Sequence, residues 1–370
     1  MNKIAVIGAS YLQLPLVKKA KEMGLYTLCF AWENGAVCKD EVDEFYPISI
    51  VEKEQILEVC REKKIDGVCT IASDVAAPTV AYVAEQMGLV GNAYEVAVRA
   101  NNKYLMRQAF SAAGVPCPAF QKITSSVQLD SSYFQFPVIV KPTDRSGSLG
   151  ITKVEYEEGL KTAVETALEC SFKHEAIVEE FVEGREISVE FISYKGTHYP
   201  LQITDKVTTG APHFVELEHH QPADLPKEQY SQIYGLTNKA LNALGVTNGA
   251  SHSEYKITND GRIFVMEIGA RMGGDFIGSD LVQLSTGYDY LKGVIEVALG
   301  TFNEPAFGKR HYAGVYFLCE ETCRLLPIIK AGVLPNVVRA EIINEELRMV
   351  ECSGDRSGYA IYQGKEKISL

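Results

Sequence analysis

The chain has 370 residues, which is long enough for two or three domains. Its hydrophobic content of 46% and charged content of 23% are those of a folded globular protein. The formal net charge of −12 argues against a nucleic-acid partner, because binding to a phosphate backbone depends on clustered Lys and Arg. No segment approaches the roughly 18 apolar residues of a membrane helix, so no membrane partner is expected.

The nine cysteines are scattered, with no C-x-x-C pair and no histidine at zinc-ligand spacing. This distribution favours buried reduced thiols. The first residues, MNKIAVIGAS, fit a first strand better than a secretory signal. The expected compartment is therefore the cytoplasm.

Residues 1–95 alternate strand-like and helix-like segments. The expected strands are KIAVIG (3–8), YTLCFA (26–31) and IDGVCTIAS (65–73), and the expected helices are 14–24, 53–64 and 76–88. Short β-runs separated by amphipathic helices that end at glycine indicate a parallel sheet with crossover helices. We predict a complete N-terminal α/β domain over 1–95.

The turn after the first strand resembles a nucleotide-binding turn but lacks two of its glycines. The dinucleotide fingerprint needs glycine at three places, and here Gly8 is followed by Ser10 and Gln13. A side chain at position 10 would stand where phosphate oxygens come closest. We therefore predict a Rossmann-like turn without a dinucleotide, which weakens the alternative of an NAD-binding oxidoreductase.

The next segment, 96–185, begins with a helix over 102–114 that ends at Gly114 before two prolines. A strand (136–142), a helix (160–172) and two strands joined by a turn at 183–184 follow. Lys141 ends the first of these strands and can place a charge on a phosphate. The Ser- and Gly-rich loop 145–150 can turn backbone N–H groups toward an anion, although a plain turn is the simpler interpretation.

Two other features of this region admit both a binding role and a simpler one. Lys103 lies in the first turn of its helix, where it opposes the helix dipole, and a solvated lysine is the simpler interpretation. In IVEEFVEG, main chain between the two strands could bind an adenine edge, and the following Glu186 could accept ribose hydroxyls.

Two glutamates are predicted to face each other in a hairpin over 253–271. Asp260-Gly261 is a strong signal for a two-residue turn, which would pair 259 with 262 and Glu254 with Glu267. Alternate residues, among them Phe264 and Met266, would then share a buried face. A three-residue loop would shift this register.

Two carboxylates about 5 Å apart repel each other unless a cation lies between them. Mg²⁺ suits the pair because it binds carboxylate oxygens and fills its other positions with water and phosphate oxygens. The alternatives are two exposed glutamates that happen to be neighbours, or one protonated glutamate.

Taken together, NKYLMR, VIVKPTDRSGSLGI, VEEFVEGREISVE, TDKVTTGAPHFVELEHHQP and SEYKITNDGRIFVMEIGARMGGD resemble the ATP-grasp superfamily over about residues 1–300. The sequence is most similar there to carboxylate-amine ligases of the kind of biotin carboxylase, carbamoyl-phosphate synthetase and bacterial L-amino-acid ligases. The resemblance implies a mixed α/β and α+β fold. A Rossmann-like pre-ATP-grasp sheet (1–95) would precede a lid subdomain (96–185), a second ATP-grasp subdomain (186–300) and a β-rich C-terminal extension (301–370).

The resemblance implies ATP and Mg²⁺ as cofactors, with Mn²⁺ as a substitute, and assigns roles by position. The implied ATP ligands are Lys103 and Lys141 for phosphates, Ser146, Gly147, Ser148, Leu149 and Gly150 in the lid loop, Glu179, Phe181 and Val182 at the adenine hinge, and Glu186 for ribose. Glu254 and Glu267 match the metal carboxylates. Arg271 matches an arginine that holds the γ-phosphate or acyl-phosphate, and with Lys141 it is a predicted catalytic residue.

Two positions qualify the resemblance. Gly269 stands where many members have the asparagine of E-x-N-x-R, an additional metal ligand, and its absence slightly favours the amino-acid-ligase branch. His219 matches a histidine near the acceptor site of that branch and is a third predicted catalytic residue. A surface histidine beside His220 is the alternative interpretation of that position.

The implied reaction activates a small-molecule carboxylate as an acyl-phosphate, which an amine then converts to an amide, with release of ADP and phosphate. The resemblance admits a homodimer and leaves both substrates unnamed. The alternatives are a ligase of purine or carbamoyl metabolism, a nucleotide-binding oxidoreductase, and an ATP-binding protein without turnover.

Overall fold

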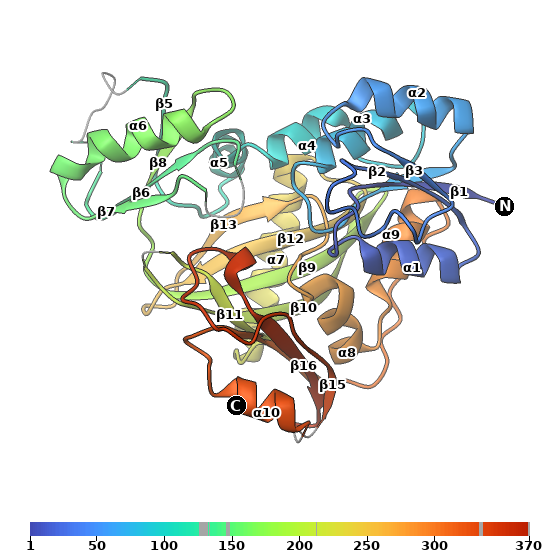
Figure 1. Cartoon of the computed structure of the whole chain (residues 1–370). Coiled ribbons are helices and arrows are strands. Elements are labelled where there is room, and N and C mark those ends of the chain that lie inside the picture. The colour runs from blue at the N-terminus through green and yellow to red at the C-terminus, as the bar shows by residue number, and fades with distance from the viewer. Residues whose placement is uncertain (126–131, 133, 146–148, 212, 333–335, 369–370) are drawn as a thin grey trace.

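The computed structural model describes residues 1–125, 132, 134–145, 149–211, 213–332 and 336–368. The chain forms three lobes (Figure 1). The N-terminal lobe and the lid lobe stand side by side above a third lobe built on a large sheet. The predicted fold class, a parallel N-terminal sheet followed by a two-part α+β region, is confirmed.

The N-terminal lobe is a four-stranded parallel sheet of order β3-β2-β1-β4. Its strands are β1 (Lys3–Ile7), β2 (Tyr26–Phe30), β3 (Glu44–Tyr46) and β4 (Gly67–Cys69), and its helices are α1 (Leu14–Glu22), α2 (Lys53–Lys63) and α3 (Ala77–Met87). All the strands and helices expected here form close to the predicted bounds, because each helix buries one apolar face against the sheet. The short β3 was not expected.

The turn between β1 and α1 is closed by its own side chains. Gln13 Oε1 accepts hydrogen bonds from the Ser10 backbone N–H at 3.1 Å and from the Ser10 hydroxyl at 2.7 Å. Gln13 Nε2 donates to the Ile71 carbonyl at 2.7 Å, and the Gln13 side chain is buried. The Gln13 side chain, which stands in place of the third glycine, therefore completes the hydrogen bonds of the turn and lies close to Gly8.

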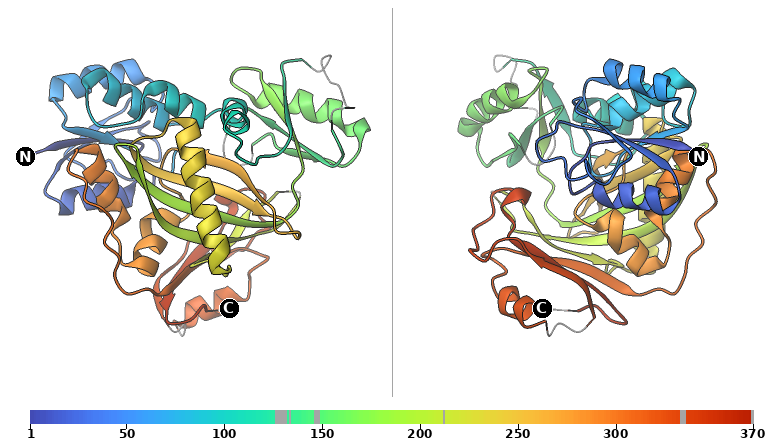
Figure 2. Two further views of the ribbon diagram at one scale, coloured as in Figure 1. Left: turned by 180° about the vertical axis from the view of Figure 1, so that it is seen from behind. Right: turned by 45° about the vertical axis from the view of Figure 1, so that its right-hand side comes forward.

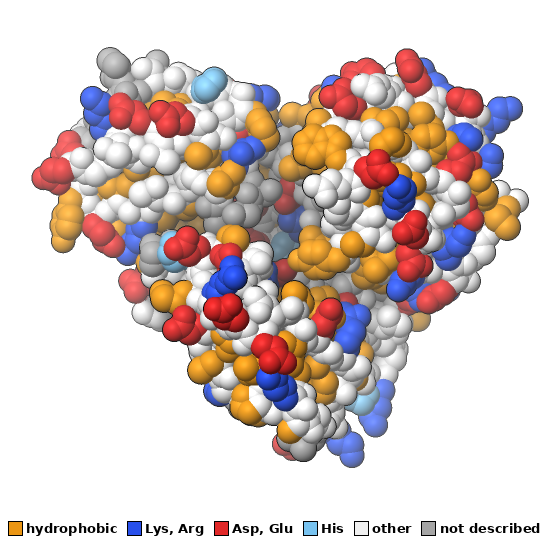
Figure 3. All heavy atoms as spheres, in the orientation of Figure 1, with side chains coloured by type: hydrophobic (Ala, Val, Ile, Leu, Met, Phe, Trp, Pro, Cys, Tyr) orange, Lys and Arg blue, Asp and Glu red, His pale blue; other side chains and the backbone are white. Residues whose placement is uncertain are grey.

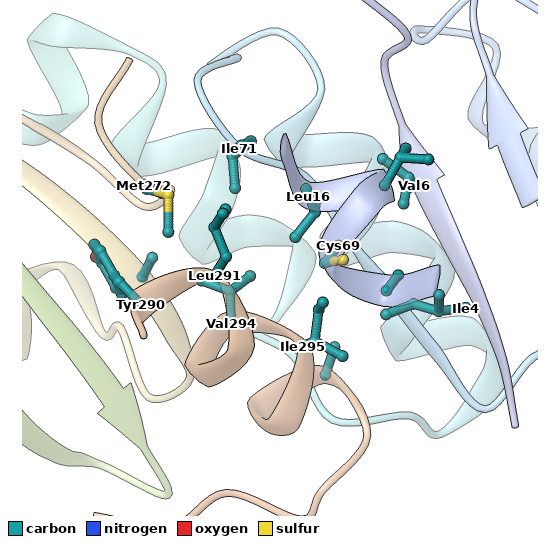
Figure 4. Close-up of a cluster of buried hydrophobic side chains, with 14 of the residues drawn as sticks. Ile4, Val6, Leu16, Cys69, Ile71, Met272, Tyr290, Leu291, Val294 and Ile295 are labelled. Carbon is teal, nitrogen blue, oxygen red and sulfur yellow. The ribbon is translucent and has the colours of Figure 1, made fainter. Parts of the chain in front are cut away.

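An apolar cluster joins the N-terminal lobe to the rest of the chain (Figure 4). Leu16 and Ile71 from the N-terminal lobe pack with Met272 and with Leu291 and Ile295 of helix α9 (Tyr290–Ala298). Because residues from distant parts of the sequence share one buried core, the N-terminal lobe is fixed against the lobe that carries the predicted metal carboxylates.

The lid lobe has a four-stranded antiparallel sheet of order β5-β8-β6-β7 covered by helix α6. The strands are β5 (Phe120–Ile123), β6 (Val138–Pro142), β7 (Thr152–Val154) and β8 (Ala176–Glu180), and α6 spans Leu160–Cys170. Helices α4 (Tyr94–Ala100) and α5 (Lys103–Ala112) connect this lobe to the N-terminal lobe. The prediction of two strands around residues 183–184 is confirmed, but β8 and the following strand lie in different sheets, so the turn is a hinge between lobes.

The third lobe is an eight-stranded antiparallel sheet of order β13-β12-β9-β10-β11-β14-β16-β15. Its strands are β9 (Arg185–Tyr194), β10 (Thr197–Thr208), β11 (Glu216–Gln221), β12 (Gly249–Ile257), β13 (Ile263–Gly269), β14 (Tyr312–Leu318), β15 (Val337–Ile342) and β16 (Gly358–Gly364). Its α-helices are α7 (Lys227–Leu244), α8 (Val282–Thr286), α9 and α10 (Leu325–Ala331). Helix α7 crosses the back of the sheet (Figure 2).

The C-terminal residues do not form a separate β-rich unit. Strand β14 pairs with β11, β16 pairs with β14, and β15 pairs with β16, so these three strands extend the sheet that contains β9. The predicted boundary near residue 300 therefore falls inside one continuous sheet.

The hairpin pairs Glu254 with Glu267 as predicted, although its turn differs from the predicted one. The loop has three residues, because the Thr258 N–H donates to the Arg262 carbonyl at 2.9 Å and Gly261 has φ +83°. This loop shifts the register by one near the turn, and a β-bulge at Met266 restores it before the glutamates are reached.

Because of this register shift, the side chains of β13 that are buried near the turn differ from the predicted ones. Near the turn, Ile263 and Val265 are buried against Tyr255 and Ile257, whereas Phe264 is only half-buried. Met266, also expected on that face, instead lines the central cavity.

Candidate active site

A cavity of about 460 Å³ lies where the three lobes meet, in the hollow visible in Figure 3. This volume is within the range of small-molecule sites. Most of the predicted site residues line it: Lys103, Lys141, Leu149, Gly150, Glu179, Phe181, Val182, Glu186, Glu254, Glu267 and Arg271. Ser146, Gly147 and Ser148, predicted for the lid loop, lie outside the described residues.

Helix α5 delivers Lys103 to the cavity. Asn102 caps the helix by accepting a hydrogen bond from the Leu105 N–H at 3.0 Å, which fixes where the first turn begins. Lys103 Nζ lies 3.0 Å from Glu267 Oε1 and 2.8 Å from the Arg145 carbonyl oxygen. Its side chain is only 8% exposed, so the interpretation as a solvated surface lysine is wrong.

Strand β6 delivers Lys141, which is held by a buried carboxylate. Glu179 Oε2 lies 2.6 Å from Lys141 Nζ, and Glu179 Oε1 lies 2.6 Å from Arg107 Nε on α5. Burial lowers the pKa of Lys141, and Glu179 opposes that effect. Burial raises the pKa of Glu179, and the two cations overcome this and lower it, so the carboxyl group stays ionised. The Glu179 side chain therefore orients Lys141, the lysine predicted to bind a phosphate. This role differs from the contact with adenine that was predicted for Glu179.

The hinge between β8 and β9 carries the remaining predicted nucleotide contacts. The Phe181 N–H donates to the Pro137 carbonyl at 3.2 Å and is thus used within the lid lobe. The Phe181 ring lies 4.3 Å from Lys153 Nζ. Glu186 Oε1 lies 3.0 Å from Lys256 Nζ on β12, with both side chains on the cavity wall. Groups of the lid lobe and charged side chains of the third lobe therefore lie close together at this hinge.

Each of the two facing glutamates has a cation beside it. Lys206 Nζ on β10 lies 2.6 Å from Glu254 Oε1 and 3.4 Å from Glu216 Oε1. Lys206 lowers the pKa of Glu254 well below its ordinary value, against the effect of burial. Lys103 Nζ lies 3.0 Å from Glu267 Oε1. Glu254 is therefore ionised, and each of the two carboxylates lies beside an ammonium group.

A buried histidine supports Glu254 from behind. His252 Nδ1 bonds the fully buried Glu190, and His252 Nε2 lies 3.5 Å from Glu254 Oε1. Burial lowers the pKa of His252, but Glu190 overcomes this and raises it to about 9. The imidazolium therefore links a buried carboxylate to a cavity carboxylate.

The donor set fits one Mg²⁺. Glu254 and Glu267 are register partners whose side chains are 36% and 31% exposed in the same cavity. Mg²⁺ usually takes one or two protein carboxylates and completes its shell with water and phosphate oxygens. Among the described residues there is no group of three or more His, Cys, Asp or Glu side chains that could hold a metal ion.

Arg271 lies at the end of the cavity next to the N-terminal lobe. Its Nε and Nη2 atoms each lie 2.8 Å from a carboxylate oxygen of Asp74, in the loop after β4. Gly269, two residues earlier, lines the cavity as well. Gly269, which stands in place of the asparagine of E-x-N-x-R, therefore lies next to the contact between Arg271 and Asp74 of the N-terminal lobe.

His219 is not among the residues that line the cavity. It lies on β11 with 1% of its surface exposed, and its ring packs edge-on against Phe317. Its nearest charged partner is Asp275, whose Oδ2 lies 3.9 Å from His219 Nε2. Burial lowers the pKa of His219. The interpretation of His219 as a surface histidine is wrong, because its side chain is buried against Phe317. Its placement near an acceptor site stays a prediction.

Sequence reasoning did not find Asp74, Arg107, Glu190, Lys206 or His252. A charged residue inside an apolar strand, as Lys206 and Glu190 are, was the one available signal. Asp74 follows an apolar run ending in Ser73 and looks like an ordinary loop residue. Only its contact with Arg271 gives it significance.

Part of the chain that lines the cavity is similar to known proteins. Residues 134–280 match the model of the ATP-grasp domain. The chain is 28% identical over 263 residues to alanine–anticapsin ligase of Bacillus subtilis (strain 168), covering 62% of this chain and 55% of that protein. It is 29% identical over 198 residues to D-alanine–D-alanine ligase of Staphylococcus carnosus, covering 50% and 55%. The chain thus spans about half the length of the curated relatives it matches.

Two solved structures have the same fold. The L-amino acid ligase of Bacillus licheniformis superposes with a TM-score of 0.82 at 22% identity, covering 99% of this chain and 94% of that one. The N5-carboxyaminoimidazole synthetase of Staphylococcus aureus complexed with ADP superposes with a TM-score of 0.81 at 15% identity, over 99% and 94%. No helix among the described residues is both long and apolar enough to cross a membrane.

Proposed function

Because residues 134–280 form an ATP-grasp domain, we propose that this chain is an ATP-dependent ligase that joins a carboxylate to an amine. The observation that carries the proposal is one cavity lined by two buried lysines, an arginine and two facing carboxylates. The names of the matched relatives, an alanine–anticapsin ligase and an L-amino acid ligase, favour amino acids as substrates.

We assign the nucleotide to the lid side of the cavity. Lys141 and Lys103, both less than a tenth exposed, would contact its phosphates. The hinge at Phe181 and Val182 would take the adenine ring, and Glu186 the ribose hydroxyls. Leu149 and Gly150, which line the cavity, would lie near the phosphates.

The proposed first step is phosphoryl transfer. A substrate carboxylate oxygen bonds to the γ-phosphorus of ATP, and the bond from that phosphorus to the β,γ-bridging oxygen breaks to give an acyl-phosphate and ADP. The charge of Lys141 and Arg271 stabilises the negative charge of the transferred group. Catalysis here is mainly positioning and charge neutralisation, with no covalent protein intermediate.

The proposed second step forms the amide. The amine nitrogen bonds to the acyl carbon, phosphate leaves with the electron pair of the C–O bond, and the nitrogen loses a proton. His219 is buried and is not among the residues that line the cavity, which argues against direct proton transfer to it.

Glu254 and Glu267 would hold Mg²⁺, or Mn²⁺ in its place, together with phosphate oxygens and water. When bound, the ion neutralises phosphate charge during transfer. Lys103 and Lys206 contact these carboxylates and set their orientation. Their ammonium groups also offset the repulsion between the two glutamates.

The test is a screen for phosphate release with ATP and Mg²⁺. Each of the twenty L-amino acids is tested alone and in pairs, with formate and bicarbonate as separate arms. Phosphate and ADP released only when a carboxylate and an amine are both present, with an amide detected by mass spectrometry, would support the proposal. Release driven by bicarbonate or formate would move the protein to the purine or carbamoyl class, to which the N5-carboxyaminoimidazole synthetase belongs by name. Nucleotide binding without turnover in every arm would contradict a ligase.

A further inference from the structure

Arg271 is held by a carboxylate that comes from another lobe. Asp74 Oδ1 lies 2.8 Å from Arg271 Nε, and Asp74 Oδ2 lies 2.8 Å from Arg271 Nη2, so the pair is bidentate. The two residues are 197 positions apart in the chain. Burial raises the pKa of Asp74, and the Arg271 guanidinium overcomes this and lowers it. Both groups are therefore charged and bound to each other.

The contact requires a glycine at position 269. A Cβ atom placed on Gly269 would lie 2.8 Å from Asp74 Oδ1 and 3.2 Å from Arg271 Cζ, both closer than ordinary contact distance. The backbone of Gly269 has no positive φ, so its conformation alone would accept any residue. Space, rather than backbone freedom, is what this glycine supplies.

The loop that carries Asp74 is fixed by several contacts. Ile71 forms an isolated parallel bridge with Met272, and the Ala72 N–H donates to the Met272 carbonyl at 3.0 Å. Ala72 has φ +55°, which a residue with a side chain adopts only where the surroundings hold it. Gln13 donates to the Ile71 carbonyl at 2.7 Å. Asp74 therefore reaches Arg271 from a rigid support.

The pairing leaves part of the guanidinium free for a ligand. A guanidinium has five N–H donors in a planar fork. Asp74 takes the edge formed by Nε and Nη2, and Arg271 Nη1 also donates to the Met272 carbonyl at 3.3 Å. Among the described residues these contacts leave one N–H on each of Nη1 and Nη2, and Arg271 lines the cavity. Such an edge matches two phosphate oxygens.

We propose that Asp74 is a positioning residue. It holds one edge of Arg271 so that the other faces the terminal phosphate of a nucleoside triphosphate, and Gly269 provides the space for this contact. The inference rests on the proposed function, because it takes that phosphate as the ligand of Arg271. In the opposite arrangement Asp74 competes with phosphate for Arg271. Removing the Asp74 carboxylate would then strengthen, rather than weaken, the binding of a nucleoside triphosphate.

The experiment compares two nucleotides by isothermal titration calorimetry, both with Mg²⁺. The probes are ADP and the non-hydrolysable β,γ-imido analogue of ATP, and the measured quantity is the ratio of their dissociation constants. The variants are Asp74→Asn, Gly269→Ala, Asp74→Ala and the double variant Asp74→Ala/Gly269→Ala. Gly235→Ala, at an exposed glycine of α7 with open space around its Cβ position, is the matched control.

We expect Asp74→Asn and Gly269→Ala each to reduce the preference for the triphosphate analogue about tenfold, with ADP affinity nearly unchanged. In the Asp74→Ala background, adding Gly269→Ala should cause less than about a twofold further loss, because the carboxylate it would displace is gone. Gly235→Ala should match the unaltered protein. A general folding defect would instead weaken both nucleotides together.

Three outcomes would overturn the positioning role. One is an unchanged or increased triphosphate preference in Asp74→Asn, which indicates competition. Another is a loss in the double variant equal to the two single losses combined, and the third is equal weakening of both nucleotides. Failure of the ligase proposal is a separate result, seen when the unaltered protein keeps its triphosphate preference and no substrate pair yields an amide. If the unaltered protein binds neither nucleotide, both proposals are wrong.

Discussion

The β1–α1 turn and the central cavity both combine a strand end with small residues, yet they differ in what satisfies their polar groups. In the turn, the Gln13 side chain accepts from Ser10 and donates to Ile71, so the chain completes its own hydrogen bonds. In the cavity, Lys103 and Lys141 are buried with their ammonium groups beside carboxylates on the cavity wall. We infer that a strand-turn-helix pattern indicates a binding site only where its hydrogen-bond donors line a space that can hold a ligand.

The largest expected effect comes from the paired glutamates. Glu267→Gln keeps the size of the side chain but removes its charge, so turnover should fall by about 10² or more while the fold persists. Steady-state ADP release and circular dichroism check the two parts. Asp260→Asn, at the exposed tip of the same hairpin, is the control and should be neutral. Full activity in Glu267→Gln would rule out the metal assignment.

The second effect concerns nucleotide binding through Lys141. Lys141→Ala removes a buried cation, and we expect ADP to bind at least about tenfold more weakly by calorimetry. The matched control is Lys122→Ala, because Lys122 lies in the same sheet and pairs with Glu175 away from the cavity. An unchanged ADP affinity in Lys141→Ala, or an equal loss in both variants, would contradict the phosphate role.

The third prediction is that the β1–α1 turn contributes to the stability of the fold but not to nucleotide binding in the cavity. Gln13→Ala leaves buried polar groups of the turn without partners, which should lower the free energy of unfolding by about 1 to 3 kcal/mol. Nucleotide affinity should not change. Gln55→Ala, on the exposed face of α2, should leave stability unchanged within about 0.5 kcal/mol. A Gln13 variant that loses nucleotide affinity but keeps its stability would make the turn part of the site.

The smallest effect is a pH dependence within the N-terminal lobe. Lys63 and Tyr46 lower the pKa of Glu44 from 4.5 to about 2. A carboxyl whose pKa is lower in the folded state contributes stability above pH 4.5 and loses it as the pH falls toward 2. Because Glu44 is partly exposed, Glu44→Gln should lower the free energy of unfolding by at most about 1 kcal/mol at pH 7. Urea titrations at pH 7 and pH 3 should show the difference shrinking at the lower pH, and an equal difference at both would contradict the assignment.

Much of the fold and part of the site followed from local patterns. The alternation of strands and helices over 1–95 and the helix after Asn102 form as predicted. The facing of Glu254 and Glu267 was right, but it results from a three-residue loop compensated by a bulge at Met266, which sequence alone did not indicate. Local periodicity identifies elements well because each element buries one face. Local periodicity does not indicate where a β-bulge inserts an extra residue into a strand.

The sequence by itself determined which chemical groups are present and which short segments form strands, helices and turns, because these depend on neighbours only a few residues apart. The tertiary structure decided which groups meet. It paired Glu179 with Arg107 and Lys141, buried His219 against Phe317, and brought Asp74 to Arg271 across 197 positions. The physical reason is that burial and charge pairing act through space, so the ionisation and orientation of a side chain are set by partners that sequence spacing does not specify.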